Sequence, residues 1–105
     1  DLAQTQALQL IRRAQILSRS ASHDSNWGVK FDAHSIIVYC GNDYAGRSTT
    51  LDETTTVPED ITFSGTEEVN FKKNSLLPYA PATIKISSSG EDKEISVNSR
   101  GVIDY

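Results

Sequence analysis

The chain has 105 residues, of which 37% are hydrophobic and 23% are charged, and its net charge is -4. This length suits one domain, and the composition supports a packed core, which excludes an intrinsically disordered chain. The negative charge argues against a protein that coats nucleic acid, because phosphate binding depends on clustered cations. The single cysteine, Cys40, excludes an intrachain disulfide and a zinc site built from cysteines.

Residues 1 to about 19 predict one amphipathic helix, because no Gly or Pro interrupts them and apolar residues recur with the period of a helix. Glutamines and arginines fall largely on the opposite face. The apolar stripe runs along Ala3, Ala7, Leu10, Ala14 and Leu17, and Leu8 and Ile11 widen it.

The two halves of this helix are expected to differ. We expect Leu10, Ala14 and Leu17 to be buried against a sheet, and Leu2 and Ala3 to be far more exposed. The apolar pattern is already under way at Leu2 without a starting cap. This indicates a helix that continues a longer upstream one.

From about residue 27 the apolar period changes from 3.6 to 2, which predicts β-strands. The β-branched run at 35–40 predicts a central strand that is covered on both faces. The segments 61–63 and 69–71 flank Ser64-Gly65, which predicts a hairpin. Helix first and strands after is the α+β pattern. We therefore expect the N-terminal helix to pack on a small antiparallel β domain, about 27–105, with seven or eight short strands in two apposed sheets.

The helix sequence and the last strands together carry a family resemblance. Residues 7–15 read Ala-Leu-Gln-Leu-Ile-Arg-Arg-Ala-Gln, and a polar break, a strand with Trp27 and the apolar run 36–39 follow. Residues 84–86 and 94–103 form an alternating pair of segments with a Gly turn. This order resembles the type IV pilin-like family, and it is most similar to the minor pseudopilins of type II secretion and related minor pilins.

The resemblance implies a non-enzymatic structural subunit of a type IV pilus or type II secretion filament. Such a subunit binds other pilin or pseudopilin subunits through its helix, and it is held in the bacterial cytoplasmic membrane by an N-terminal segment that this sequence lacks. Its β domain would be periplasmic or extracellular. The residues expected to carry assembly are those of the apolar stripe: Leu2, Ala3, Ala7, Leu10, Ala14 and Leu17.

A filament-tip minor pilin that binds DNA or a carbohydrate is the alternative function. Related DNA-uptake pilins bind DNA through closely spaced arginines near the C-terminus, whereas here Arg100 stands alone before Gly101. Lys72 and Lys73 are the other cations that fit such a contact. Nucleic acid is therefore not the expected partner.

Candidate catalytic groups are few. His23 and His34 fall in turns, and Cys40 ends an apolar strand, where we expect it to be buried. A glycosidase would need one desolvated carboxyl facing another across a cleft. The four acidic pairs are expected to be solvated instead: Asp52-Glu53, Glu59-Asp60, Glu67-Glu68 and Glu91-Asp92. The sequence predicts no catalytic site, no cofactor and no metal.

Overall fold

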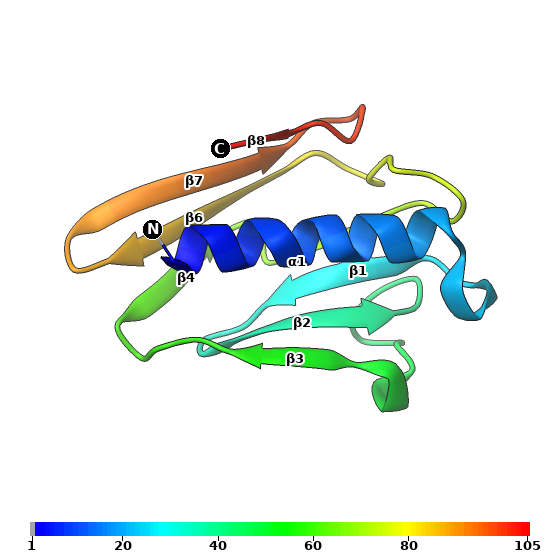
Figure 1. The fold of residues 1–105 in the computed structure, drawn as a ribbon, viewed down its shortest axis with the longest axis horizontal. Helices are drawn as coiled ribbons and strands as arrows, with labels where there is room; N and C mark the ends of the chain where they lie inside the picture. Colours follow the sequence, from blue (N-terminus) through cyan, green and yellow to red (C-terminus); the bar gives the residue numbers. More distant parts are fainter. Residues whose placement is uncertain (1) are drawn as a thin grey trace.

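The computed structural model describes residues 2–105, which form one long helix and eight strands (Figure 1). The helix α1 ends one residue before the polar turn that the sequence predicts. The elements are α1 (Leu2–Arg19), η1 (Ser22–Asp24), β1 (Trp27–Phe31), β2 (Ser35–Cys40), η2 (Thr49–Leu51), β3 (Glu53–Thr56), β4 (Ile61–Gly65), β5 (Glu68–Asn70), β6 (Ala82–Ser88), β7 (Glu91–Val97) and β8 (Ile103–Asp104).

The strands form two four-stranded antiparallel sheets. Sheet A has the order β3-β2-β1-β5, and sheet B has the order β4-β6-β7-β8. Together with α1 they make an α+β fold, which confirms the predicted fold class. The chain enters sheet B at β4, returns to sheet A at β5, and enters sheet B again at β6.

The predicted hairpin between 61–63 and 69–71 is wrong. β4 pairs with β6, with Phe63 opposite Ile86, whereas β5 pairs with β1, with Val69 opposite Val29. At Gly65 the chain turns with φ +86°, a conformation that glycine adopts without strain. The glycine that suggested a hairpin therefore marks the point where the chain leaves one sheet for the other.

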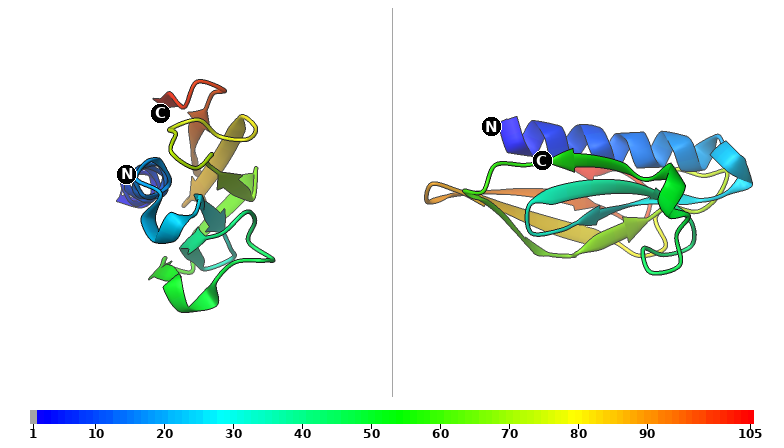
Figure 2. Two further views of the ribbon diagram at one scale, coloured as in Figure 1. Left: turned by 90° about the vertical axis from the view of Figure 1, so that its right-hand side faces the viewer. Right: turned by 90° about the horizontal axis from the view of Figure 1, so that it is seen from below.

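The helix lies over the junction of the two sheets. It packs on β1 and β2 of sheet A and on β7 of sheet B. Figure 1 shows α1 between β1 and β7, and the end-on view in Figure 2 shows it on one side of the strands. One helix face thus covers apolar residues of both sheets, and these form a single core.

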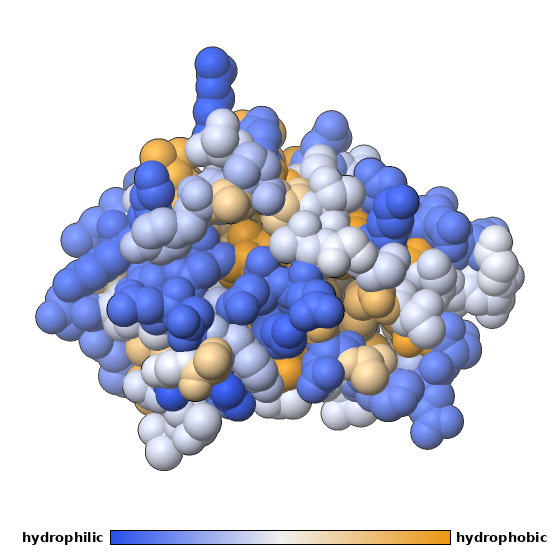
Figure 3. Space-filling view, turned by 180° about the vertical axis from the view of Figure 1, so that it is seen from behind, coloured by the Kyte–Doolittle hydropathy of each residue, from blue (hydrophilic) through white to orange (hydrophobic). Residues whose placement is uncertain are grey.

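Apolar residues that alternate with exposed residues along the strands form this core. In β6, Ala82, Ile84 and Ile86 are buried, while the residues between them are exposed. β2 is buried on both faces, as predicted, because Ile37 and Tyr39 are buried as well as the core residues that alternate with them. The face of the molecule opposite α1 is mostly hydrophilic, with small apolar patches (Figure 3).

Candidate functional site

The outer face of α1 carries two large apolar side chains in solvent. Leu2 is 76% exposed and Ile16 is 61% exposed, and they lie about four turns apart on the surface of the helix. α1 also contains three arginines and no Asp or Glu, and one of these arginines, Arg13, is paired with Glu53, so the helix surface keeps a positive charge from Arg12 and Arg19. This exposed apolar and basic face is the main candidate for an interaction surface.

The inner face of α1 is taken up by the protein's own sheets. Ala3, Ala7, Leu8, Ile11 and Ala14 are all buried in the core. Alanines at three of these positions let the helix approach the strands closely, because a methyl group adds little thickness between the two surfaces. The predicted apolar stripe is therefore largely the surface on which the domain folds.

Two expectations for this stripe are wrong. Ala3 is 5% exposed, although we expected it to be far more exposed than the C-terminal half. Leu10 and Leu17 are only partly buried at the margin of the core, although we expected them to be buried. The cause is the orientation of the helix about its own axis, which differs from the expected one and places Ile11, and not Leu10, toward the sheets. Ala14 is buried and Leu2 is exposed, as predicted.

Side-chain hydrogen bonds fix the C-terminal half of α1. The Nε2 of Gln15 donates to the carbonyl oxygens of Leu76, at 3.0 Å, and Gly101, at 2.7 Å. The Oγ of Ser18 lies 3.0 Å from the carbonyl oxygen of Phe71 and accepts a bond from the backbone N–H of Trp27 at 3.2 Å. Gln15 and Ser18 are buried, whereas the sequence pattern placed Gln15 on the polar face.

Ionic and ring contacts connect the helix margins to the sheets. Arg13 binds Glu53 of β3 through two hydrogen bonds of 2.9 Å. The hydrogen bond from Arg13, followed by its charge, lowers the pKa of Glu53. On the other margin the guanidinium of Arg12 lies 5.8 Å from the ring centre of Tyr105. These contacts leave Leu2 and Ile16 uncovered between them.

The three predicted DNA contacts lie near the C-terminal end of α1. The segment that carries Lys72 and Lys73 and the turn that carries Arg100 meet there, because Gln15 binds both Leu76 and Gly101. Lys73 forms an ion pair with Asp24. Lys72 lies 5.9 Å from the ring centre of Tyr79. The fold thus brings the cations to one end, but one of them is already neutralised.

The prediction that all four acidic pairs are solvated is wrong for two of their members. Asp52 is largely buried and forms an ion pair of 3.0 Å with Arg47. Glu68 accepts hydrogen bonds from the hydroxyl of Tyr39, at 2.5 Å, and from the backbone N–H of Tyr44, at 3.1 Å. The sequence did not show these roles, because Tyr39 lies far from Glu68 in the chain and the fold of the loop after β2 brings Arg47 to Asp52.

Glu68 belongs to a polar network on the outer face of sheet A. The Nδ2 of Asn70 donates to the hydroxyl of Tyr39 and to the carbonyl oxygen of Gly41. Burial, and then the hydrogen bond to Glu68, raise the pKa of Tyr39. A Cβ at Gly28 would lie 2.5 Å from the hydroxyl of Tyr39, so only glycine leaves room for this ring. The network holds the loop after β2 on the sheet.

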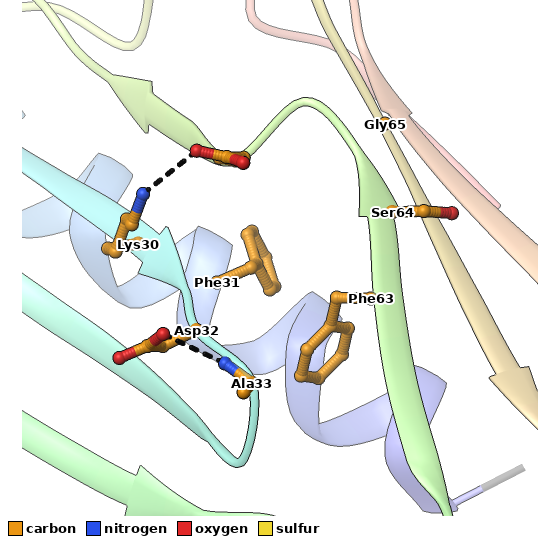
Figure 4. A pocket seen from close by; sticks show the side chains of 8 residues that line it. Lys30, Phe31, Asp32, Ala33, Phe63, Ser64 and Gly65 are labelled. Atoms are coloured by element: carbon orange, nitrogen blue, oxygen red, sulfur yellow. Dashed lines mark hydrogen bonds and ion pairs between the residues drawn. The ribbon is translucent and has the colours of Figure 1, made fainter.

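A cleft of about 460 Å³ lies between the end of β1 and β4. Figure 4 shows Phe31 and Phe63 pointing toward each other across it, and their ring centres are 5.3 Å apart. Two carboxylates line it, but Glu67 is 79% exposed and bound to Lys30, and Asp32 is exposed and bound to the N–H of Ala33. Neither carboxyl is desolvated in the way that a glycosidase acid requires.

No protein-family model, curated protein or solved structure matches this chain. No helix within residues 2–105 combines the length and the apolar character needed to cross a membrane. Within the same residues, no group of three or more His, Cys, Asp and Glu side chains converges as a metal site would. Cys40 is buried, as predicted.

Proposed function

We propose that this protein is a non-enzymatic structural subunit of a filament of the type IV pilus or type II secretion kind, and that it assembles through the outer face of α1. The observation that carries the proposal is the exposure of Leu2 and Ile16 on a helix whose other face is already buried. Covering a large apolar side chain with a partner stabilises the complex by about 25 cal/mol for each Å² of apolar surface that is removed from water.

The arrangement of the domain supports this role. α1 lies on one side of both sheets, so its outer face is open along its length to a neighbouring subunit (Figure 2). The opposite face is mostly hydrophilic and would face solvent in an assembly (Figure 3). Arg12 and Arg19 of α1 favour a partner surface with negative charge, whereas Arg13 is already paired with Glu53. In this proposal the subunit works in the bacterial cell envelope, with pilins or pseudopilins as its partners.

The contact surface differs from the one that the sequence favoured. Of the six residues expected to carry assembly, Ala3, Ala7 and Ala14 are covered by the protein's own sheets. Leu10 and Leu17 are partly covered, and Leu2 remains free to meet a partner. The proposal therefore replaces the predicted stripe by Leu2, Ile16 and the arginines around them.

The test uses the full-length protein in the cells that produce it, with a photo-crosslinking amino acid at Ile16. We expect ultraviolet light to join it to a filament subunit, and we expect Ile16→Asp to prevent incorporation. Ile16→Asp should leave the melting temperature of the domain unchanged within a few degrees, because the residue is exposed. Thr54→Asp, on the exposed surface of β3, is the matched control. Normal incorporation of the Ile16→Asp protein would refute the proposal.

Binding of DNA at a filament tip is the second candidate. Lys72 and Arg100 lie at one end of the molecule. Lys72 lies beside the ring of Tyr79, which is 62% exposed and offers a surface on which a base can stack. The measurement is a fluorescence-anisotropy titration with duplex DNA at low and moderate salt. Each phosphate contact contributes about -0.9 to the log-log salt slope, and we expect no more than one or two contacts. Micromolar binding with a steep salt dependence that Arg100→Ala removes would favour the tip function.

A further inference from the structure

Each sheet has two edge strands, and β4 is the least protected of the four. β8 has two residues, and β5 has three and includes Glu68. β3 carries Glu53, which binds Arg13. β4 has five residues, Ile-Thr-Phe-Ser-Gly, with no charge and no proline. Folded proteins usually protect an exposed edge with charges, prolines or short length, because unpaired N–H and C=O groups recruit other strands.

The register shows which groups of β4 are free to recruit a strand. The N–H of Thr66 donates to the carbonyl oxygen of Thr83. In an antiparallel pair the residues that bond to the partner alternate, so Ser64 bonds toward β6 while Phe63 and Gly65 direct their N–H and C=O groups away from it. These groups face the side of β4 on which the cleft lies.

Two phenylalanine rings lie at the cleft beside this edge, and Phe31 is almost fully buried while Phe63 is partly buried. Phe63 from β4 and Phe31 from β1 point into it, whereas Ser64 points away (Figure 4). Its volume of about 460 Å³ falls within the range of about 300–1,000 Å³ that is usual for ligand sites. An extended chain along β4 would place one row of side chains on the two rings, because strand side chains alternate.

Charge at the rim favours a cationic partner. Lys30 is already bound to Glu67 at 3.2 Å, so these two charges offset each other. Within residues 2–105 the carboxylate of Asp32 has no cationic partner, and it accepts a hydrogen bond of 2.9 Å from the backbone N–H of Ala33. A Lys or Arg side chain beside Asp32 would complement the rim.

We propose that the cleft between β1 and β4 binds an extended peptide segment of another protein by strand addition to β4. The segment would place apolar side chains on Phe31 and Phe63 and a Lys or Arg beside Asp32. Because strands flank the cleft on both sides, its occupant must be a single strand without neighbours in a sheet. A strand inside a folded second copy does not meet this condition. Strand addition gains affinity from backbone bonds and specificity from alternate side chains.

The test uses the chain of residues 1–105 and a synthetic peptide with blocked ends, Lys-Val-Thr-Val-Thr-Val. Backbone amide NMR shifts should change along β4 and at the end of β1. At saturation, hydrogen exchange of the Phe63 and Gly65 amides should slow about tenfold or more, because bound peptide protects them. The same peptide with N-methylated backbone amides is the control, because it keeps the side chains and loses the donors.

Two charge variants sharpen this test. Asp32→Lys should weaken binding about two- to fivefold at low salt, as expected for one exposed charge pair. Asp43→Lys is matched, because Asp43 also binds a backbone N–H, that of Gly46, but lies in the loop after β2. The inference is overturned if millimolar peptide changes no shifts or if the N-methylated peptide binds equally well. It is also overturned if the Phe63 and Gly65 amides of the free protein exchange as slowly as that of Ser64. Self-association that protects the same amides would identify a second copy as the occupant instead.

Discussion

The two halves of α1 are buried to a similar extent but differ in the hydrogen bonds that fix them. The N-terminal half packs through Ala3, Ala7 and Leu8, and Gln4 donates a hydrogen bond of 3.3 Å to the carbonyl oxygen of Glu94. The C-terminal half packs through Ile11 and Ala14, and the side chains of Gln15 and Ser18 also bind two separate loops.

This difference shows what each half can contribute. Apolar contacts fix how close a helix lies to a sheet but do not strongly fix its position along the axis, whereas hydrogen bonds are directional. Gln15 and Ser18 therefore set the register of α1 on the sheets. Residues near the N-terminal end can present Leu2 to a partner while the far end keeps the helix in place.

The largest expected effect is the loss of a core side chain. Ile11→Ala should destabilise the domain by about 2–5 kcal/mol, because Ile11 has no exposed surface and its truncation leaves a cavity. Leu10→Ala should cost clearly less, since Leu10 is only partly buried at the core margin. Urea unfolding of both variants measures the difference. Equal losses would show that the helix is rotated differently from the structure.

A second prediction concerns the loop that anchors Gln15. Gly101 has φ +79°, and a Cβ added there would collide with the carbonyl oxygen of Leu76, so Gly101→Ala should cost more than about 2 kcal/mol. Gly90 has φ +81°, and a Cβ added there would meet nothing within 4 Å. Gly90→Ala should therefore cost only the backbone strain, about 1–2 kcal/mol. Thermal unfolding of the pair separates strain from collision, and equal costs would show that the collision contributes nothing.

Ser18→Ala tests the polar anchor directly. It leaves the backbone N–H of Trp27 and the carbonyl oxygen of Phe71 without this partner in a buried site. The expected cost is about 1–3 kcal/mol. Ser20→Ala is the control, because the Ser20 hydroxyl is exposed and binds only within the last turn of the helix. A change of less than about 0.5 kcal/mol in Ser18→Ala would mean that water replaces the hydroxyl.

The smallest effect is expected at the margin of α1, from Arg13 and Glu53. Arg13 lowers the pKa of Glu53 in the folded state, so the pair stabilises the domain above the ordinary pKa of Glu, about 4.3. That stability should be lost as pH falls through the lowered pKa. Because both side chains are partly exposed, the contribution is about 0.2–1 kcal/mol. The free energy of unfolding should therefore fall between pH 6 and pH 3, and Glu53→Gln should reduce this fall by the same amount. Glu91→Gln should leave the fall unchanged.

The local pattern of the sequence predicted much of the fold. The 3.6 period of residues 1–19 and the absence of Gly and Pro gave α1 nearly to its last residue. Alternation predicted most strands, and the β-branched run gave β2 with both faces covered. These features follow from neighbours along the chain, so they need no knowledge of partners.

The candidate site was less predictable, because it depends on which surface remains after packing. The stripe was visible in the sequence, but a rotation of the helix decided that Ile11 is buried and that Leu10 is not. The sequence could show that Gln15 is polar, but not that two loop carbonyls would surround it. Such contacts join residues far apart in the chain, so the periodicity of a short segment cannot predict them.

The amino-acid sequence by itself determined where helix and strands form, because hydrophobic period and turn residues act over a few neighbours. Only the tertiary structure decided how the strands pair. Residues 61–70 contain two strands that look like a hairpin, yet β4 joins β6 and β5 joins β1. A two-stranded hairpin alone is only marginally stable, whereas these pairings place each strand in a four-stranded sheet. This pairing leaves β4 as an unprotected edge strand with the cleft beside it.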